Sequence, residues 1–186
     1  TEWYDQNWSK RQRIRLSNNT ASQATSTQFR ITVTYDSDMQ SDFDDLRFTD
    51  SSGTTSIPFW VETYTASTQA VVWVKTANLP ASGVEDIFMY YGNGSASGAG
   101  VGTSTFIFFD DFEDGSLSEY SGNTTLFEQS TSFNYERTRG MDASAGNEGT
   151  GKTTDGIADL SVSIPRNSTI RAYQYIDMTT GGSDEP

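Results

Sequence analysis

The stretch QFRITVTYD, residues 28–36, decides the fold class. Large apolar side chains stand at every second position, Phe29, Ile31, Val33 and Tyr35, and polar ones stand between them. Successive side chains of a β-strand point to opposite faces, so this period of two predicts a strand with one apolar and one polar face. The β-branched and aromatic residues favour the same conformation.

The same pattern recurs along the chain. RQRIRL, residues 11–16, places Ile14 and Leu16 inward and Arg13 and Arg15 outward. Further strand candidates are DLRFTD (45–50), SIPFWVETY (56–64), AVVWVKT (70–76), DIFMYYGN (86–93), FIFFDDF (106–112), SFNYERTR (132–139), DLSVSI (159–164) and TIRAYQYID (169–177). Turn-forming clusters separate them, and no window has the apolar spacing of a helix. We therefore expect an all-β protein, an antiparallel β-sandwich of jelly-roll or lectin-like type.

The 186 residues suit one large domain or two small ones. The stretch GNGSASGAGVGTS, residues 92–104, is rich in Gly and Ser and is the candidate boundary. It divides the chain into a first module, 1–104, and a second, 105–186. The second is either a partial lectin-like module or the part that completes the first sandwich, and the sequence leaves both open.

The charge balance restricts the partners. Twenty-five acidic residues against twelve basic ones give a net charge of −13, which repels nucleic acid and anionic lipid. An Asp-rich, Lys-poor surface suits a halophilic source as well as an ordinary acidic secreted protein. No apolar run is long enough to span a membrane, and no signal peptide is evident in the sequence. We expect an extracellular or cell-surface location without direct membrane insertion.

Cysteine and histidine are both absent. Their absence excludes disulfides, thiolate metal sites, Cys nucleophiles, His-based triads and the usual zinc chemistry. Calcium, which prefers carboxylate oxygens, remains as a metal partner.

GNEGTGKTT, residues 146–154, fits the phosphate-loop pattern letter for letter. A working phosphate loop follows a buried parallel strand and begins a helix. Here the preceding residues are polar, and a strand pattern with Gly156 follows. The segment is predicted to be a hairpin loop that binds no nucleotide.

Ordered motifs in the first module resemble a known family. They are WYDQNWSKRQRIRLSN (3–18), DFDDLRFTDSSGTTSIPFWVETY (42–64) and AVVWVKTANLPASGVEDIFMYYGNGSA (70–96), with its Trp-Val-Lys and Tyr-Tyr-Gly-Asn signatures. The chain is similar to a domain of unknown function common in secreted and surface proteins of bacteria and archaea. FIFFDDFEDGSLSEY (106–120) resembles the entry into a following concanavalin-like or laminin-G-like sandwich. The resemblance implies a β-sandwich at a cell surface with no established catalytic activity.

Acidic residues gather in two segments. FFDDFEDG offers Asp110, Asp111, Glu113 and Asp114 as ligands of a structural calcium, although Asp-Gly is also an ordinary turn signal. The segment 35–50 holds six aspartates, but Gln40, Ser41 and Arg47 occupy positions where an EF-hand loop needs other residues. We interpret that second segment as a solvated acidic turn.

Aromatic residues supply the candidate glycan contacts, because sugar rings stack on exposed aromatic faces. Trp60 and Trp73 lie within strands and are expected in the core. The candidates for a surface platform are Trp3, Trp8, Tyr90 and Tyr91. Candidate N-glycosylation sites are the five N-x-[ST] sequons at Asn7, Asn18, Asn93, Asn123 and Asn167.

The sequence thus favours a non-enzymatic surface module for adhesion or glycan binding. The alternative is a structural subunit of a filament, surface layer or virion, assembled with neighbouring copies through β-strand contacts. A glycan hydrolase is the least favoured, because no pair of carboxylates is singled out.

Overall fold

The computed structural model describes residues 2–122, 124, 127–131, 138–143, 159–166 and 168–172. The chain divides into two compact units, residues 1–107 and 108–186, which are described separately below. No helix among the described residues is long and apolar enough to cross a membrane.

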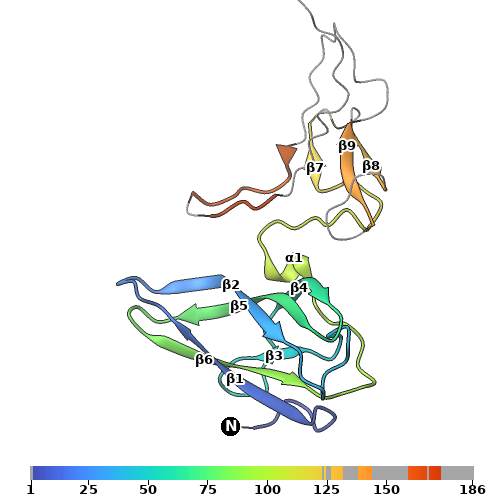
Figure 1. The fold of residues 1–186 in the computed structure, drawn as a ribbon. Helices are drawn as coiled ribbons and strands as arrows, with labels where there is room; N and C mark the ends of the chain where they lie inside the picture. Colours follow the sequence, from blue (N-terminus) through green and yellow to red (C-terminus); the bar gives the residue numbers. More distant parts are fainter. Residues whose placement is uncertain are drawn as a thin grey trace, which may run out of the picture. The chain divides into compact units, whose positions relative to one another are not determined.

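The first unit consists of two three-stranded antiparallel sheets (Figure 1). One sheet has the order β1-β6-β3, formed by β1 (Lys10–Ser17), β6 (Val84–Tyr91) and β3 (Arg47–Thr49). The other has the order β2-β5-β4, formed by β2 (Ala24–Thr34), β5 (Gln69–Leu79) and β4 (Phe59–Thr65). The prediction of an all-β protein with antiparallel sheets is confirmed.

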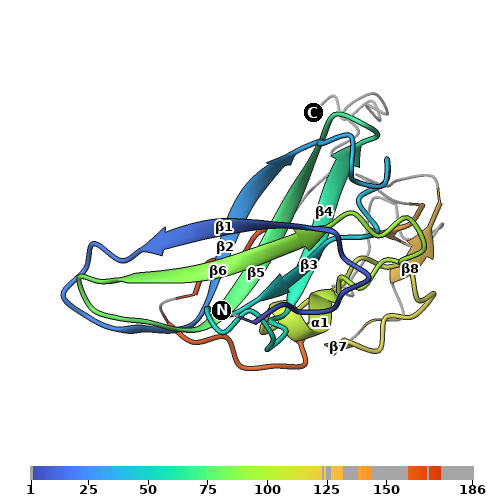
Figure 2. The same ribbon diagram turned by 90° about the horizontal axis from the view of Figure 1, so that it is seen from below.

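The core lies between these two sheets, which Figure 2 shows with β1 and β6 in front of β2 and β5. Val33 of β2, Val72 and Val74 of β5, and Ile87 and Met89 of β6 are buried in one cluster. Ile14, Ile31 and Phe29 pack against it, as the alternation predicts. Burial of apolar surface, at about 25 cal/mol per Å², is the main force that holds a disulfide-free sandwich together.

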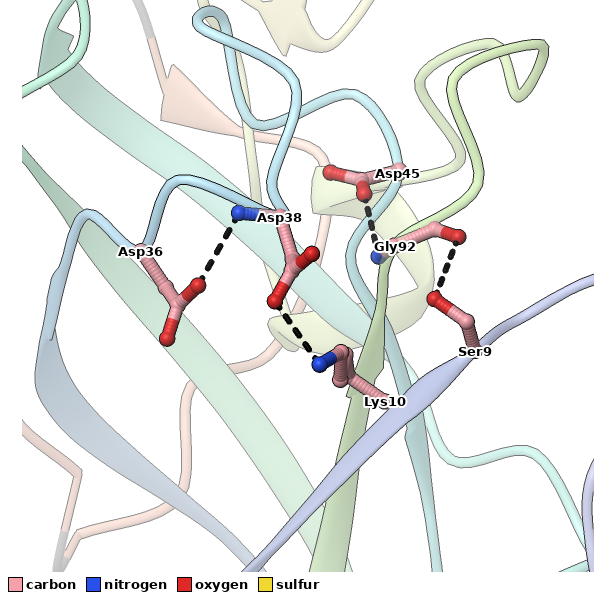
Figure 3. Close-up of polar contacts among 6 residues, drawn as sticks. All are labelled: Ser9, Lys10, Asp36, Asp38, Asp45 and Gly92. Carbon is pink, nitrogen blue, oxygen red and sulfur yellow. Dashed lines mark hydrogen bonds and ion pairs between the residues drawn. The ribbon is translucent and has the colours of Figure 1, made fainter.

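A buried aspartate joins the acidic segment to the end of β6 (Figure 3). Asp45 is 0% exposed. Its Oδ2 accepts hydrogen bonds from the backbone N–H of Gly92 (2.6 Å) and Asn93 (3.2 Å), and its Oδ1 accepts one from Gln40 N–H (3.1 Å). The three bonds together fix the position of the turn after β6.

The Gly- and Ser-rich stretch 92–104 is fastened to the first unit. Gln40 Nε2 donates to the carbonyls of Asn93 and Ala96 (both 2.8 Å), and Val101 N–H donates to Phe59 O (2.8 Å). The one-turn helix α1 (Gly102–Thr105) follows. The end of the first compact unit therefore falls at Ile107, slightly beyond the predicted boundary at residue 104.

The second unit contains two short antiparallel pairs among its described residues. One pair is β7 (Tyr120–Ser121) with β10 (Asp159–Leu160), and the other is β8 (Phe127–Ser130) with β9 (Gly140–Ala143). The prediction of a strand over 106–112 is wrong, since this segment consists of bends and irregular backbone, with Phe112 at a φ of 62°. Residues 169–172 are not in a strand either. The phosphate-loop pattern at 146–154 lies outside the described residues.

Candidate functional site

The outer face of the β1-β6-β3 sheet carries an unusual concentration of arginine. The strand register pairs Arg11 and Arg47 with Tyr90, Arg13 with Phe88, and Arg15 with Asp86. Cross-strand partners share a face, and Ile14, Ile87 and Met89 point into the core, so these partners point outward. We call this surface the arginine face and define it as Arg11, Arg13, Arg15, Arg47, Asp86, Phe88 and Tyr90, together with Trp3, which lies on it.

The N-terminal segment crosses the arginine face and covers Tyr90. Trp3 meets Tyr90 edge to face, with ring centroids 5.4 Å apart, and Trp3 Nε1 donates to Trp8 O (2.8 Å). Tyr4 packs against Trp8 and Tyr90 at 5.3 and 5.7 Å. Trp8 Nε1 donates to Asp45 O (2.6 Å). These contacts hold the Trp3 ring in place while 39% of this residue stays exposed.

Arg11 lies among aromatic rings. Its guanidinium carbon is 4.6 Å from the Phe88 centroid, 4.9 Å from Trp3 and 5.8 Å from Tyr90, all within cation–π range. Its NH1 donates to Glu2 O (3.0 Å) and Tyr90 Oη (3.3 Å). The side chain is therefore positioned by aromatic rings and neutral oxygens.

Arg13 and Arg15 share one carboxylate. Arg15 binds Asp86 through two parallel hydrogen bonds, Nε to Oδ1 (2.8 Å) and NH2 to Oδ2 (3.1 Å). Arg13 NH1 is 3.6 Å from Asp86 Oδ2. The hydrogen bond from Arg15 lowers the pKa of Asp86 below its ordinary value, so Asp86 is ionised at neutral pH. The outward orientation of Arg13 and Arg15 that the sequence predicts is confirmed.

A carboxylate cluster lies in the second unit. Asp110, Asp114 and Glu119 each offer an oxygen, and these oxygens all lie within 4.8 Å of one another. Asp110 Oδ2, Glu119 Oε2 and Gln129 Oε1 are buried atoms without a hydrogen-bond donor. Gln129 Nε2 donates to Asp114 Oδ1 (3.4 Å), which places this amide beside the cluster. Burial, with the nearby charges of Glu119 and Asp114, raises the pKa of Asp110. Three oxygens that lack donors fit a hard cation such as calcium.

The acidic segment 35–50 has a different role. Asp36, Asp42 and Asp50 each accept a hydrogen bond from the backbone N–H two residues later, which closes tight turns. Asp38 pairs with Lys10 (2.9 Å) and raises the pKa of Lys10 (Figure 3). The interpretation as a turn agrees with these contacts, but Asp45 is a buried structural residue rather than a solvated one.

Comparison with known proteins identifies part of the chain. Residues 42–125 match the model of a domain of unknown function, DUF2341. Over this segment the chain is similar to the DUF2341 family. Neither curated proteins nor solved structures give a significant match.

The DUF2341 segment spans both compact units. It begins in the acidic segment, contains β3 to β6 and α1, and continues past Ile107 through the carboxylate cluster to residue 125. The predicted resemblance to a family of unknown function is confirmed there. The β1 and β2 strands, which pair with β6 and β5, lie outside the match. The lectin-like character of the second half stays a prediction.

The structure corrects the predicted aromatic platform. Trp8 is 8% exposed and Tyr90 is 0% exposed, because the N-terminal segment and Tyr90 form a small aromatic layer on the sheet. Tyr91 packs partly buried against the core, and this burial raises its pKa. Trp3 alone of the four presents substantial surface. Arg11, which completes the site, could have been found from its alternation with Arg13 and Arg15.

Trp60 and Trp73 are also placed differently from the prediction. They face each other across β4 and β5 on the outer side of their sheet, opposite the core. Phe106 meets both rings edge to face, at 5.9 Å from Trp60 and 5.5 Å from Trp73. Together they form a second aromatic layer within the first unit.

The predicted calcium ligands are partly replaced. Asp110 and Asp114 belong to the carboxylate cluster, whereas Glu113 accepts hydrogen bonds from Thr138 N–H and Arg139 N–H (both 2.8 Å) and from the Thr138 hydroxyl. Asp111 Oδ1 lies 3.4 Å from Glu113 N and is not in the cluster. Glu119 joins Asp110 and Asp114 in the cluster instead.

The sequons differ in accessibility. Asn7 is exposed and Asn93 half-buried. Asn18 is a correction, since it is buried and its Nδ2 donates to Ser22 O (2.8 Å) and Pro80 O (2.9 Å). A glycan on that nitrogen would break these bonds. Asn123 and Asn167 lie outside the described residues.

Proposed function

We propose that the chain is an extracellular, non-enzymatic module of a surface protein, acting in adhesion, and that it binds glycans at the arginine face. The fixed and exposed ring of Trp3 is the observation that carries this proposal. Its ring is held by Arg11, Tyr90 and the Trp8 carbonyl, yet 39% of the residue is exposed. A fixed, exposed aromatic ring beside hydrogen-bond donors is suited to stacking a sugar ring.

The proposal includes no catalytic step. Glycoside cleavage needs two carboxylates that face each other across the scissile bond. Among the described residues, Asp86 is the carboxylate that pairs with arginines of this face. Arg15 binds both of its oxygens. Such a carboxylate is suited to holding arginines rather than to attacking a sugar.

Retention on a glycan array tests the proposal. Trp3→Ala is expected to weaken binding up to roughly tenfold, because an aromatic contact contributes about 0.5–1.5 kcal/mol. Tyr64→Ala is the matched control, since Tyr64 is an exposed aromatic residue on the other sheet. Failure of the unaltered chain to bind any glycan, or equal loss in both variants, would contradict the proposal.

We further propose that calcium braces the second unit at the carboxylate cluster. Asp110, Asp114 and Glu119 would hold it, with Gln129 Oε1 as a neutral ligand. A bound cation would remove the repulsion among these carboxylates and satisfy the oxygens that lack donors.

Thermal unfolding with and without calcium tests this second proposal. Saturating calcium should raise the midpoint of the second unit, and Glu119→Gln should abolish the rise. Asp111→Asn removes one neighbouring charge without touching the cluster and should leave the rise intact. A rise that survives Glu119→Gln would assign the calcium to other residues.

The alternative function is a structural subunit that joins its neighbours by strand addition. The observation in its favour is that β1 and β2, of eight and eleven residues, each form one edge of a sheet. Unpaired edge groups can accept a further strand. Sedimentation and electron microscopy of the purified chain distinguish the two, since a filament subunit should assemble with rising concentration whereas an adhesion module should stay dispersed.

A further inference from the structure

We infer that the glycan bound at the arginine face is anionic: a carboxylate-bearing polysaccharide, in which a sugar carboxylate binds Arg11 and Arg13 while the neighbouring ring stacks on Trp3. This inference rests on the proposed glycan binding and adds the charge of the ligand. Three observations lead to it.

The first is the charge of the face. Four guanidinium groups lie on one sheet surface, and Asp86 is the carboxylate that pairs with any of them in the described part of the chain. The guanidinium groups of the face therefore outnumber the carboxylate paired with them, although the net charge of the chain is −13. Charge is costly to concentrate without a partner, so an anion is the complementary ligand.

The second is the free binding capacity of Arg11 and Arg13. Arg47 donates to the carbonyls of Asp44, Leu46 and Ser97, and Arg15 is engaged by both oxygens of Asp86. Arg13 has a side chain 61% exposed and approaches Asp86 only at 3.6 Å. Arg11 donates through one nitrogen to neutral oxygens. These two side chains retain donors whose fork matches a carboxylate.

The third is geometry. Arg11, Arg13 and Arg15 alternate along β1, so their Cα atoms follow one another at about 6.6 Å. A linear polymer with a repeated carboxylate can engage neighbouring positions in this row together, which a single sugar cannot. Trp3 beside Arg11 adds an apolar surface on which a pyranose ring can stack. A peptide of Asp and Glu residues has no ring that could use this surface.

The net negative charge does not prevent such binding. The Debye length at physiological ionic strength is about 8 Å, so acidic residues farther than this from the face are largely screened. Contacts between guanidinium and carboxylate groups act at hydrogen-bond distance and persist under that screening. The hydrogen bonds that the face can donate, rather than the distant acidic residues, therefore decide whether an anionic ligand binds.

The test compares polygalacturonate with its fully methyl-esterified form, which has the same backbone without the charge. Titration calorimetry on the full chain is expected to show at least tenfold tighter binding of the charged polymer. Arg13→Gln should remove most of this difference, and it should leave the fold intact because the side chain is largely exposed. Arg166→Gln, an exposed arginine of the second unit, should leave the difference unchanged. Short oligomers should bind progressively more weakly than long ones.

Each other outcome overturns the inference in a recognisable way. Equal binding of acid and ester would leave glycan binding standing and remove the charge requirement. Equal or tighter binding of poly-glutamate, dextran sulfate or a single-stranded oligonucleotide would show a general polyanion surface and not a carboxylated glycan site. No binding of either polymer, together with an empty glycan array, would remove both this inference and the proposed function.

Discussion

Gly92 follows the last residue of β6 and has a φ of +84°, a conformation that costs other residues about 1–2 kcal/mol. A Cβ at this position would overlap Ser9 Oγ. Its N–H donates to Asp45 (2.6 Å), and its carbonyl accepts from Ser9 Oγ (3.0 Å), as Figure 3 shows. One backbone unit thus joins three segments that are far apart in the sequence.

Gly92→Ala is therefore expected to destabilise the first unit by about 1–2 kcal/mol or more, since backbone strain and overlap with Ser9 add. Urea unfolding followed by tryptophan fluorescence measures this, because all four tryptophans lie in the first unit. Gly94→Ala is the control, since its Cβ would meet no atom within 4 Å. Equal stability of the two variants would contradict the role assigned to Gly92.

Individual residues also show where sequence reasoning stops. Alternation predicts on which side of its strand a residue such as Trp60 or Tyr90 lies, but not what covers that side. Tyr90 points away from the core and is still buried, because Trp3 and Tyr4 return from the chain's beginning to cover it. Long-range contacts of this kind have no local sequence signal.

At the level of elements, cross-strand pairs connect stability to pH. Asp86 of β6 and Arg15 of β1 are register partners, and their hydrogen bonds lower the pKa of Asp86 from its ordinary value of 3.8. A carboxyl whose folded pKa is lowered stabilises the fold above its ordinary pKa, and this contribution is lost as the pH falls through the lowered value.

Asp86→Asn is accordingly expected to lower the urea midpoint of the first unit slightly at neutral pH. The difference from the unaltered chain should shrink below about pH 3.8 and disappear at lower pH. High salt should also reduce it, since the pair is exposed. A difference that stays constant from pH 7 to pH 2 would show that the substitution acts through packing.

The single-turn helix α1 and the residues before it form an ordered segment that composition did not predict. Residues 92–104 have the Gly and Ser content of a linker, yet their carbonyls accept bonds from Gln40, Arg47 and Lys75. Side-chain donors from elsewhere in the fold therefore order a segment that has no strand or helix pattern. The five strands of seven or more residues in the first unit were predictable because burial of one face imposes a period of two. The attachment of residues 92–104 depends instead on contacts between distant residues.

Phe106, which directly follows α1, anchors this segment to the sheet by packing against Trp60 and Trp73. Phe106→Ala is expected to destabilise the first unit by about 1–3 kcal/mol, since two aromatic pairs are lost. The tryptophan emission should also shift to longer wavelength as water reaches both rings. Ile107→Ala removes an adjacent, 54% exposed side chain and should change neither property. An unaltered emission spectrum in Phe106→Ala would contradict the proposal that Phe106 shields Trp60 and Trp73 from water.

At the scale of the whole molecule, the family match and the compact units divide the chain differently. The DUF2341 segment omits β1 and β2, which pair with β6 and β5. It therefore also omits Arg11, Arg13 and Arg15, which lie on β1. It also crosses the limit between the units at Ile107. The physical unit of folding in the first half is thus larger than the matched segment at its beginning and shorter at its end.

Truncated chains test which division governs folding. Residues 1–107 contain both sheets and Phe106, so this fragment is expected to unfold cooperatively with nearly the urea midpoint of the full chain. Residues 1–104 lack Phe106 and should show the same loss of about 1–3 kcal/mol as Phe106→Ala. Residues 42–125 lack one strand of each sheet and should give no cooperative transition in tryptophan fluorescence, because burial of the core needs both sheets. Cooperative unfolding of the 42–125 fragment would mean that β1 and β2 are additions to a sandwich that is complete without them, and that the arginine face is an accessory of the domain rather than part of its structural core.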